Sequence, residues 1–167
     1  VRIYEKSRLL AKKASEGERR FIEAMSHNRL NQGVDFRKSI DPLVELGEDY
    51  PGERLVFMIL GQLYNGDGKG DLAAEAFKKA QAIGPRSARA EAFLAGHAML
   101  QGRYAEARTQ YEAIEKSLPR GSVPFAIRFG VTFSHLYENN VDAALASLKT
   151  YLDEYRANGL DQQFPEV

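Results

Sequence analysis

The sequence predicts an all-α fold, a solenoid of antiparallel helix hairpins, and two observations support this prediction. First, Pro51, Pro85 and Pro119 stand 34 residues apart twice over, a period typical of helix–turn–helix repeats that stack on one another. Second, the residues around the prolines recur at the same interval. The recurring pairs are Leu60 and Leu94, Gly61 and Ala95, Gly68 and Gly102, Ala73 and Ala107, Phe77 and Tyr111, and Ala80 and Ile114.

The residue type at each recurring position matches what a hairpin array needs. Small residues such as Gly61 and Ala73 suit places where two helix backbones approach closely, and large ones such as Phe77 fill the space between helices. Gly68 and Gly102 fall between two helices, where a turn often needs a positive φ. A proline at the end of each unit stops its second helix. One stripe has the spacing of a buried helix face: Ala73, Phe77, Ala80 and Ile83.

This pattern resembles the tetratricopeptide repeat (TPR), whose units carry Leu-Gly, Tyr, Gly, Ala, Phe, Ala and Pro in a fixed order. Residues 54–87 match it almost completely and residues 88–121 match it well. Residues 20–53 match it more weakly and put Ser39 in a small-residue position, while residues 122–157 resemble a fourth, degenerate unit. The resemblance implies a right-handed superhelix of about four hairpin units after an N-terminal helix.

The fourth unit can be aligned with the others only by allowing an insertion. Phe129 and Gly130 are aligned with the Leu-Gly pair, and Ala144, Leu148 and Tyr151 with the second helix. The unit then holds about two more residues than the 34-residue period. We expect these residues in the turn between its two helices.

Caps and periodicity define the individual helices in order. The first is amphipathic, and Ser15 with Glu18 has the spacing of a capping box that starts the second. Pro42 lies inside the third, where an interior proline costs about 3 kcal/mol, so that helix is either kinked or begins at Asp41-Pro42. Asn158-Gly159 supplies the final stop signal. The expected helices cover residues 3–14, 16–31, 35–49, 54–66, 70–83, 88–101, 104–117, 122–137 and 141–157.

Composition fits one repeat domain over residues 1–167. The formal net charge is +0, which argues against a general nucleic-acid binder, and no apolar run of about 18 residues predicts a membrane span. Residues 1–20 hold seven Lys/Arg against three Asp/Glu, whereas residues 138–167 hold two against six. This gradient reflects either solvated helix faces or, alternatively, head-to-tail stacking or an attached neighbouring domain.

The two ends predict a piece of a longer repeat protein. The chain starts at Val1, and its last residues, 164–167, read Phe-Pro-Glu-Val. They resemble the Tyr-Pro-Gly-Glu of residues 50–53, which leads into the next expected helix. No signal-peptide pattern precedes the first helix, and the absence of cysteine leaves the compartment open.

The sequence offers no candidate catalytic residue, metal ligand or cofactor site. His27, His97 and His135 fall in three different units, so none pairs with another at metal-ligand spacing. The glycine-rich stretch 66–70 lacks the preceding strand and the Lys-Ser/Thr ending of a phosphate-binding loop, and it also lacks the ligand series of a calcium loop. We interpret it as a turn between helices and predict a protein that is not an enzyme.

The resemblance instead implies a protein-interaction module. In TPR arrays the first helix of each unit lines a concave groove that holds an extended or helical peptide. Carrying that over position by position gives four residues in each unit: Ala24, Asn28, Asn31 and Gln32; Leu55, Met58, Gln62 and Asn65; Arg89, Ala92, Gly96 and Met99; and Ile127, Val131, Ser134 and His135. The main candidates for peptide binding are Asn28, Asn31, Gln32, Met58, Gln62, Asn65, Arg89 and Met99, because amides pair with peptide groups and methionine adapts its shape.

One known peptide-binding mode is not predicted. Some TPR proteins hold the carboxyl terminus of heat-shock chaperones with a clamp of lysine, asparagine and arginine. Asn28 and Arg89 match two of its positions, but Ala24, Ile59 and Phe93 occupy the other three without a charge or an amide.

The sequence alone leaves open the role of the chain within a larger protein and its self-association. The chain could be a structural or sensory repeat region of a larger multidomain protein, or part of an enzyme whose active domain lies elsewhere. Self-association also stays open. The sequence predicts a protein or peptide partner without identifying it.

Overall fold

The computed structural model describes residues 14–26, 35–119 and 123–157. All regular structure in these ranges is helical, which confirms the all-α class predicted from the sequence. The helix expected over residues 3–14 and the stop signal at residues 158 and 159 lie outside the described residues.

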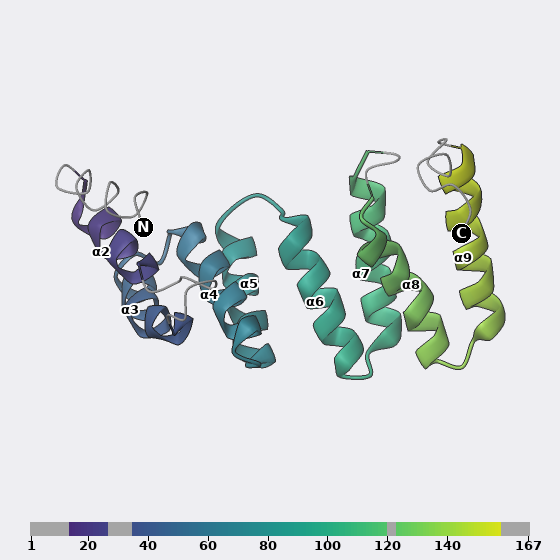
Figure 1. The fold of residues 1–167 in the computed structure, drawn as a ribbon, viewed down its shortest axis with the longest axis horizontal. Helices are drawn as coiled ribbons and strands as arrows, with labels where there is room; N and C mark the ends of the chain where they lie inside the picture. Colours follow the sequence, from purple (N-terminus) through teal and green to yellow (C-terminus); the bar gives the residue numbers. More distant parts are fainter. Residues whose placement is uncertain (1–13, 27–34, 120–122, 158–167) are drawn as a thin grey trace. The chain divides into compact units, whose positions relative to one another are not determined.

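Figure 1 shows the described helices in their order along the chain. In order, they are α2 (Glu16–Met25), the 3-10 helix η2 (Phe36–Ser39), α3 (Ile40–Asp49), α4 (Arg54–Gly66), α5 (Gly70–Ile83), α6 (Ala88–Leu100), α7 (Tyr104–Ser117), α8 (Phe125–Tyr137) and α9 (Val141–Ala157). From residue 54 onward the predicted ranges match these bounds closely. The largest difference is at α8, which begins at Phe125 because Pro124 occupies its N-cap position.

The predicted capping box starts α2. The Ser15 hydroxyl accepts a hydrogen bond from the backbone N–H of Glu18 at 3.3 Å, and the Glu18 carboxylate accepts one from the backbone N–H of Ser15 at 2.8 Å. α2 ends at Met25 rather than near residue 31, and Ser26 is its C-cap. The Ser26 hydroxyl donates to the carbonyl oxygen of Glu23 at 2.7 Å, a local bond that competes with continued helix.

Pro42 is accommodated near the start of α3. The 3-10 turn η2 comes first, with the Asp35 side chain accepting from the backbone N–H of Arg37 at 3.2 Å. α3 then begins at Ile40, so Pro42 lies in the first turn. Backbone N–H groups there have no partner within the helix, so a residue without an N–H loses nothing. The sequence left two alternatives, a kinked helix over residues 35–49 or a helix that begins at Asp41-Pro42. The observed start at Ile40 is closer to the second.

The three hairpins α4–α5, α6–α7 and α8–α9 share one turn. Each turn has three residues, 67–69, 101–103 and 138–140. The middle residue has a positive φ: +75° at Gly68, +75° at Gly102 and +60° at Asn139. The prediction for both glycines is confirmed, and asparagine is among the non-glycine residues that adopt this conformation most readily.

The insertion in the fourth unit lies elsewhere than predicted. Asn139 occupies the position of Gly102, 37 residues on (139 − 102), and its turn has no extra residue. The extra length lies in the connection between α7 and α8, residues 118–124, which is three residues longer than the α5–α6 connection, residues 84–87. Hydrogen bonds within the hairpin turn fix its length, whereas the connection between two successive hairpins tolerates additional residues.

The register of α8 therefore shifts by two residues from the predicted one. Thr132, not Gly130, occupies the position of Ala95 (95 + 37), and it is buried like Ala95. Its hydroxyl lies 3.1 Å from that of Ser147 on α9. The second helix was aligned correctly, since Ala144 is buried like Ala107.

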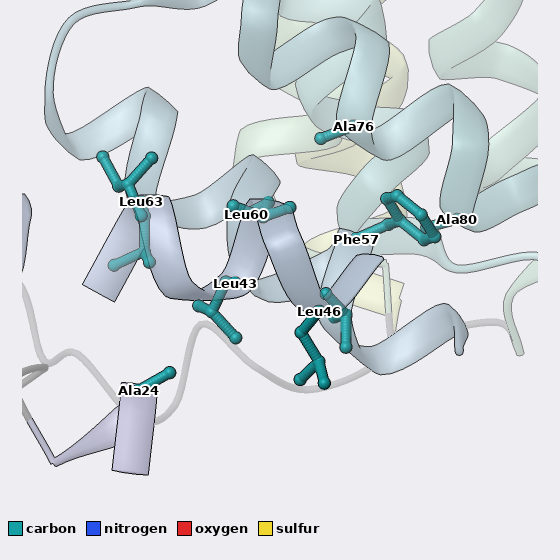
Figure 2. Packing of buried hydrophobic residues seen from close by; sticks show 10 residues of the cluster. Ala24, Leu43, Leu46, Phe57, Leu60, Leu63, Ala76 and Ala80 are labelled. Carbon is teal, nitrogen blue, oxygen red and sulfur yellow. The ribbon is translucent and has the colours of Figure 1, made fainter. Parts of the chain in front are cut away.

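Unit 1, residues 1–86, is built around α2, α3, α4 and α5. Figure 2 shows its core, in which apolar side chains of these helices meet. The labelled residues are Ala24, Leu43, Leu46, Phe57, Leu60, Leu63, Ala76 and Ala80, and all are buried. Ser39 is fully buried beside them, and its hydroxyl donates to the carbonyl oxygen of Ala24 at 2.8 Å. A serine is thus tolerated in a small-residue position because its hydroxyl is paired.

Gly61 packs as closely as its position in the repeat predicts. A Cβ atom at Gly61 would lie 2.7 Å from the ring of Phe77 on α5. In the predicted buried stripe of α5, Ala73, Phe77 and Ala80 are buried. The fourth member, Ile83, is 36% exposed and was wrongly included, because it ends the helix and no further turn follows it.

Unit 2, residues 87–167, contains α6, α7, α8 and α9. Consecutive helices pack against each other, and α8 also contacts α6. Its core contains Ala95 and Ala98 of α6, Ala107, Tyr111 and Ile114 of α7, and Ile127 of α8. Gly130 lies against Tyr111, where a Cβ atom would come within 2.5 Å of the ring. The border between the two units falls after residue 86. That residues 1–167 act as one repeat domain stays a prediction.

Candidate interaction surface

The candidate surface belongs to the first helix of each hairpin. These first helices are α2, α4, α6 and α8. α2 is highly charged, with Glu16, Glu18, Arg19, Arg20 and Glu23 among its ten residues, whereas α4 and α8 carry one charged residue each. Arg54 is the one Asp, Glu, Lys or Arg of α4, and Arg128 is the one of α8. The second helices are richly charged by comparison; α9 alone has Asp142, Lys149, Asp153, Glu154 and Arg156. A face that serves only solvation is ordinarily charged, so the uncharged faces of α4 and α8 need another explanation.

In unit 1, α4 presents the predicted residues on one face. Gln62 and Asn65 are exposed, Leu55 is 56% exposed, and Met58 is half-buried against the core. Spacings of three and four residues place all four on one side of the helix. This face offers two amides and two apolar side chains and no charge.

For the first predicted repeat, residues 20–53, the structure describes only one of the four candidate residues. Asn28, Asn31 and Gln32 lie outside the described residues, so their place in a groove stays a prediction. Ala24 is buried, with 1% of its surface exposed, and its carbonyl oxygen is bound by Ser39. It belongs to the core and is removed from the candidate surface.

In unit 2, α6 presents its predicted face as well. Arg89 is exposed at the start of the helix, and Ala92, Gly96 and Met99 follow it as half-buried residues. Leu100, beside Met99, is 88% exposed. This face is mainly apolar, with one cation at the N-terminal end of the helix.

On α8 the predicted residues were chosen in the wrong register. Ile127 and Ser134 are buried, and His135 is held by Arg108 of α7, whose Nη1 lies 3.3 Å from the His135 Nδ1. Val131, the remaining one, is half-buried against the core of unit 2. The positions equivalent to the α6 face are 37 residues on: Ala126, Phe129, Phe133 and Leu136.

With this register, α8 carries a row of exposed aromatic side chains. Phe125 is 57% exposed, Phe133 43% and Tyr137 63%. The Phe129 ring lies between two of them, with centroids 3.8 Å from Phe125 and 5.5 Å from Phe133. Leu136 extends the row and is 42% exposed. The sequence could have indicated this row, because the run Phe-x-x-x-Phe-x-x-x-Phe has the spacing of one helix face.

Two arginines hold α8 in place between its neighbours. Arg128, whose side chain is only 13% exposed, pairs with Glu115 of α7 at 3.0 Å and with Glu154 of α9 at 2.5 Å. Its guanidinium also lies 5.3 Å from the ring centroid of Tyr151. Arg108 of α7 reaches Glu138 at 2.7 Å. The aromatic row is therefore presented by a helix that is fixed on both sides.

The described histidines have ordinary structural roles. The ring of His97 stacks on that of Phe93 with centroids 6.2 Å apart, and its Nε2 lies 3.0 Å from the Gln101 amide nitrogen. His135 is held by Arg108, and His27 lies outside the described residues. Among the residues that the structure describes, no group of three His, Cys, Asp or Glu side chains could hold a metal ion.

Burial shifts the pKa of two tyrosines in the hairpins. It raises the pKa of the Tyr111 phenol, which packs against Gly130, and that of Tyr64 on α4. Burial thus favours the neutral form of both phenols.

Unit 1 also contains a hollow of about 660 Å³ beside α2 and the start of α4. Its apolar walls include Phe21, Ile22, Leu55 and Val56. Glu18 lies at the same hollow, and the hydrogen bond from the backbone N–H of Ser15 lowers the pKa of its carboxyl group. The volume suits one or more apolar side chains.

Over residues 14–26, 35–119 and 123–157, no helix is long and apolar enough to cross a membrane. No protein-family model matches the chain, and no curated protein matches it by sequence.

The comparison with solved structures shows the fold. The chain is similar to a crystal structure of MamA with 16% sequence identity and a TM-score of 0.71, over 95% of this chain and 88% of that one. A second crystal structure of MamA gives 17% identity and a TM-score of 0.74, over 99% and 86% of the two chains. MamA is a TPR-containing protein. The TPR-like helical repeat fold predicted from the sequence is thereby confirmed.

Proposed function

We propose that this chain is a non-catalytic protein-interaction module that holds a peptide or protein segment against the exposed faces of its first helices. The observation that carries the proposal is the aromatic row of α8, which is fixed by Arg128 and in which Phe125, Phe133 and Tyr137 stay 43–63% exposed. Large exposed apolar groups on a rigid helix are typical of interaction surfaces.

The side chains on these faces suit a peptide ligand. Gln62 and Asn65 on α4 can each donate to and accept from peptide groups. Phe133 and Leu136 on α8 can receive apolar side chains, and Met99 on α6 adapts to their shape. The partner we propose is an extended or helical segment with apolar side chains and few charges.

Arg89 adds a preference for an acidic group. It is exposed at the start of α6. A guanidinium binds a carboxylate with two parallel hydrogen bonds. Asn28, Asn31 and Gln32 complete the proposal as predicted groove residues of the first hairpin.

Two double variants test the faces directly. Partners are captured from a native lysate with the wild-type chain and then titrated against Gln62→Ala with Asn65→Ala, and against Phe133→Ser with Leu136→Ser. Losing two hydrogen bonds of about 0.5–1.5 kcal/mol each should weaken binding roughly 5- to 100-fold. The serine pair should weaken it at least as much, because both apolar contacts are lost.

Matched controls come from the second helices. Lys78→Ala with Lys79→Ala on α5, and Leu145→Ser with Leu152→Ser on α9, change exposed residues of similar character. Both should leave affinity within about twofold of wild type. If a control pair abolishes binding while both first-helix pairs retain it, the proposal is wrong. A structural or sensory role within a larger protein or enzyme would then be the better hypothesis.

A further inference from the structure

The outer face of α9 carries a continuous apolar stripe. Its members are Val141, Leu145, Leu148, Leu152 and Tyr155, and Ala144 alone among the residues of α9 is buried. Val141 is 53% exposed, Leu145 59% and Leu152 41%. Nothing among the described residues of unit 2 covers these three side chains.

The equivalent stripe on α7 is covered. Moving back 37 residues from the α9 stripe gives Tyr104, Arg108, Tyr111, Glu115 and Leu118. Of these, Tyr104 stacks on Tyr137 of α8 with centroids 5.5 Å apart, and Tyr111 lies against Gly130. Arg108 and Glu115 form ion pairs with α8. The α9 stripe is therefore the equivalent surface, and no described helix of unit 2 covers it.

The composition of the two stripes differs in a way that indicates a different kind of neighbour. The α7 stripe includes Arg108 and Glu115, which need charged partners on α8. The α9 stripe has apolar or aromatic residues at all five positions, with spacings of four, three, four and three residues. Such a sequence has the 3.5-residue repeat of a seam between two like helices.

We propose that α9 pairs in antiparallel orientation with α9 of a second copy of this chain, about a two-fold axis near its centre. The charges beside the stripe support this orientation. Asp142, Lys149 and Arg156 are seven residues apart and lie along one edge of the stripe. Antiparallel pairing brings Asp142 of each copy to Arg156 of the other, so the interface gains two ion pairs. Parallel pairing brings together neither pair.

The central lysine does not oppose this arrangement. Lys149 lies opposite itself across the two-fold axis, but its Nζ is 2.8 Å from Asp153 on the same helix. That carboxylate offsets the like charge at the centre. α9 has 17 residues and is about 25 Å long. Because one helix per copy makes a small interface, we expect a dissociation constant on the order of 10–100 µM.

Sedimentation equilibrium of the full chain tests the pairing. Wild type should show a monomer–dimer equilibrium, and Leu145→Lys with Leu152→Lys should weaken it at least about tenfold. The control, Leu72→Lys with Leu100→Lys, changes exposed leucines of α5 and α6 and should leave association unchanged. Far-UV circular dichroism of each variant establishes that it is folded.

A charge exchange tests the orientation. Asp142→Arg alone and Arg156→Asp alone should each weaken association, because each opposes like charges. An equimolar mixture of the two variants should associate again, since the introduced arginine of one meets the introduced aspartate of the other. The doubly substituted chain should recover as well.

Three outcomes would overturn the proposal. A chain that stays monomeric to about 1 mM would leave the stripe to a helix of another protein. Association that survives the Leu145 and Leu152 substitutions would place the interface elsewhere, for example between basic and acidic ends of successive copies. Association lost in both single charge variants but not restored in their mixture would exclude the antiparallel arrangement.

Discussion

Individual positions in the hairpins are decided by how closely two helices approach. Gly61 fits against Phe77 because it has no Cβ atom, and Ser39 fits against Ala24 because its hydroxyl is small and paired. The repeat period allowed the sequence to predict the glycine position. It could not predict the pairing of Ser39, since the acceptor is a backbone oxygen 15 residues away.

Replacing Gly61 with leucine should therefore destabilise the fold. The new Cβ would lie 2.7 Å from the buried ring of Phe77, which is 2% exposed and has no room to move. Overpacking of this kind costs about 1–3 kcal/mol or more. Chemical denaturation of the variant measures the loss in the free energy of unfolding.

Gly52 provides the control for this substitution. Nothing lies within 4 Å of a Cβ atom there, so Gly52→Leu should change the stability little. Equal stability of the two variants would mean that the close contact at Gly61 is not limiting.

The helices are held by interactions at their ends and along their flanks. The capping box of α2 and the turns at Gly68 and Gly102 are local, so the sequence predicted them correctly. It was wrong about the turn at Asn139, where it placed extra residues. The ion pairs of Arg128 join three helices and are long-range. The residues next to Arg128 in the sequence do not predict these ion pairs, because Glu115 and Glu154 are both more than a dozen positions away.

Arg128→Met should weaken the packing of α8 in unit 2. The substitution keeps the apolar stem but leaves Glu115 and Glu154 without this partner. We expect a loss of about 1–2 kcal/mol in the free energy of unfolding, measured by urea denaturation. Salt should reduce the difference, since Glu154 is about half exposed.

Arg103→Met is the matched control. Arg103 pairs with Glu106 three residues on in the same region, and its side chain is 45% exposed. Such a pair contributes at most about 0.5 kcal/mol. If Arg103→Met lowers the free energy of unfolding as much as Arg128→Met does, the ion pairs that join three helices contribute no more stability than a local pair.

At the scale of the whole molecule, the sequence predicted the helices from residue 54 onward and their order, but not the faces of the fourth hairpin. Its helix bounds followed from turn and periodicity signals that persist even in a degenerate repeat. The register of α8 did not, because Phe129-Gly130 resembles the Leu-Gly pair and Gly130 is indeed closely packed, but against Tyr111 of the preceding hairpin. Because Gly130 resembles the glycine of the Leu-Gly pair, the predicted surface included the buried residues Ile127 and Ser134 in place of Phe133 and Leu136.

Stability should also differ along the chain. α9 has one buried residue, whereas α4 and α5 each have five. In a repeat array the least covered unit opens first, so hydrogen exchange of dilute protein should be fastest in α9 and slowest across residues 54–117. Exchange monitored by mass spectrometry after proteolysis gives this order.

The same measurement at high protein concentration separates two explanations. If α9 pairs with a second copy, its exchange should slow as concentration rises while that of α4 and α5 stays unchanged. Protection of α9 equal to that of α4 in dilute protein would contradict the expected order.

The unequal connections have a practical consequence for anyone who alters this chain. Three hairpin turns keep the same length and the same positive φ, while the connection 118–124 holds three residues more than its counterpart. A tag, a protease site or a fluorophore is therefore best inserted in this connection. The same insertion beside Gly68, Gly102 or Asn139 would break the hydrogen bonds that set each hairpin.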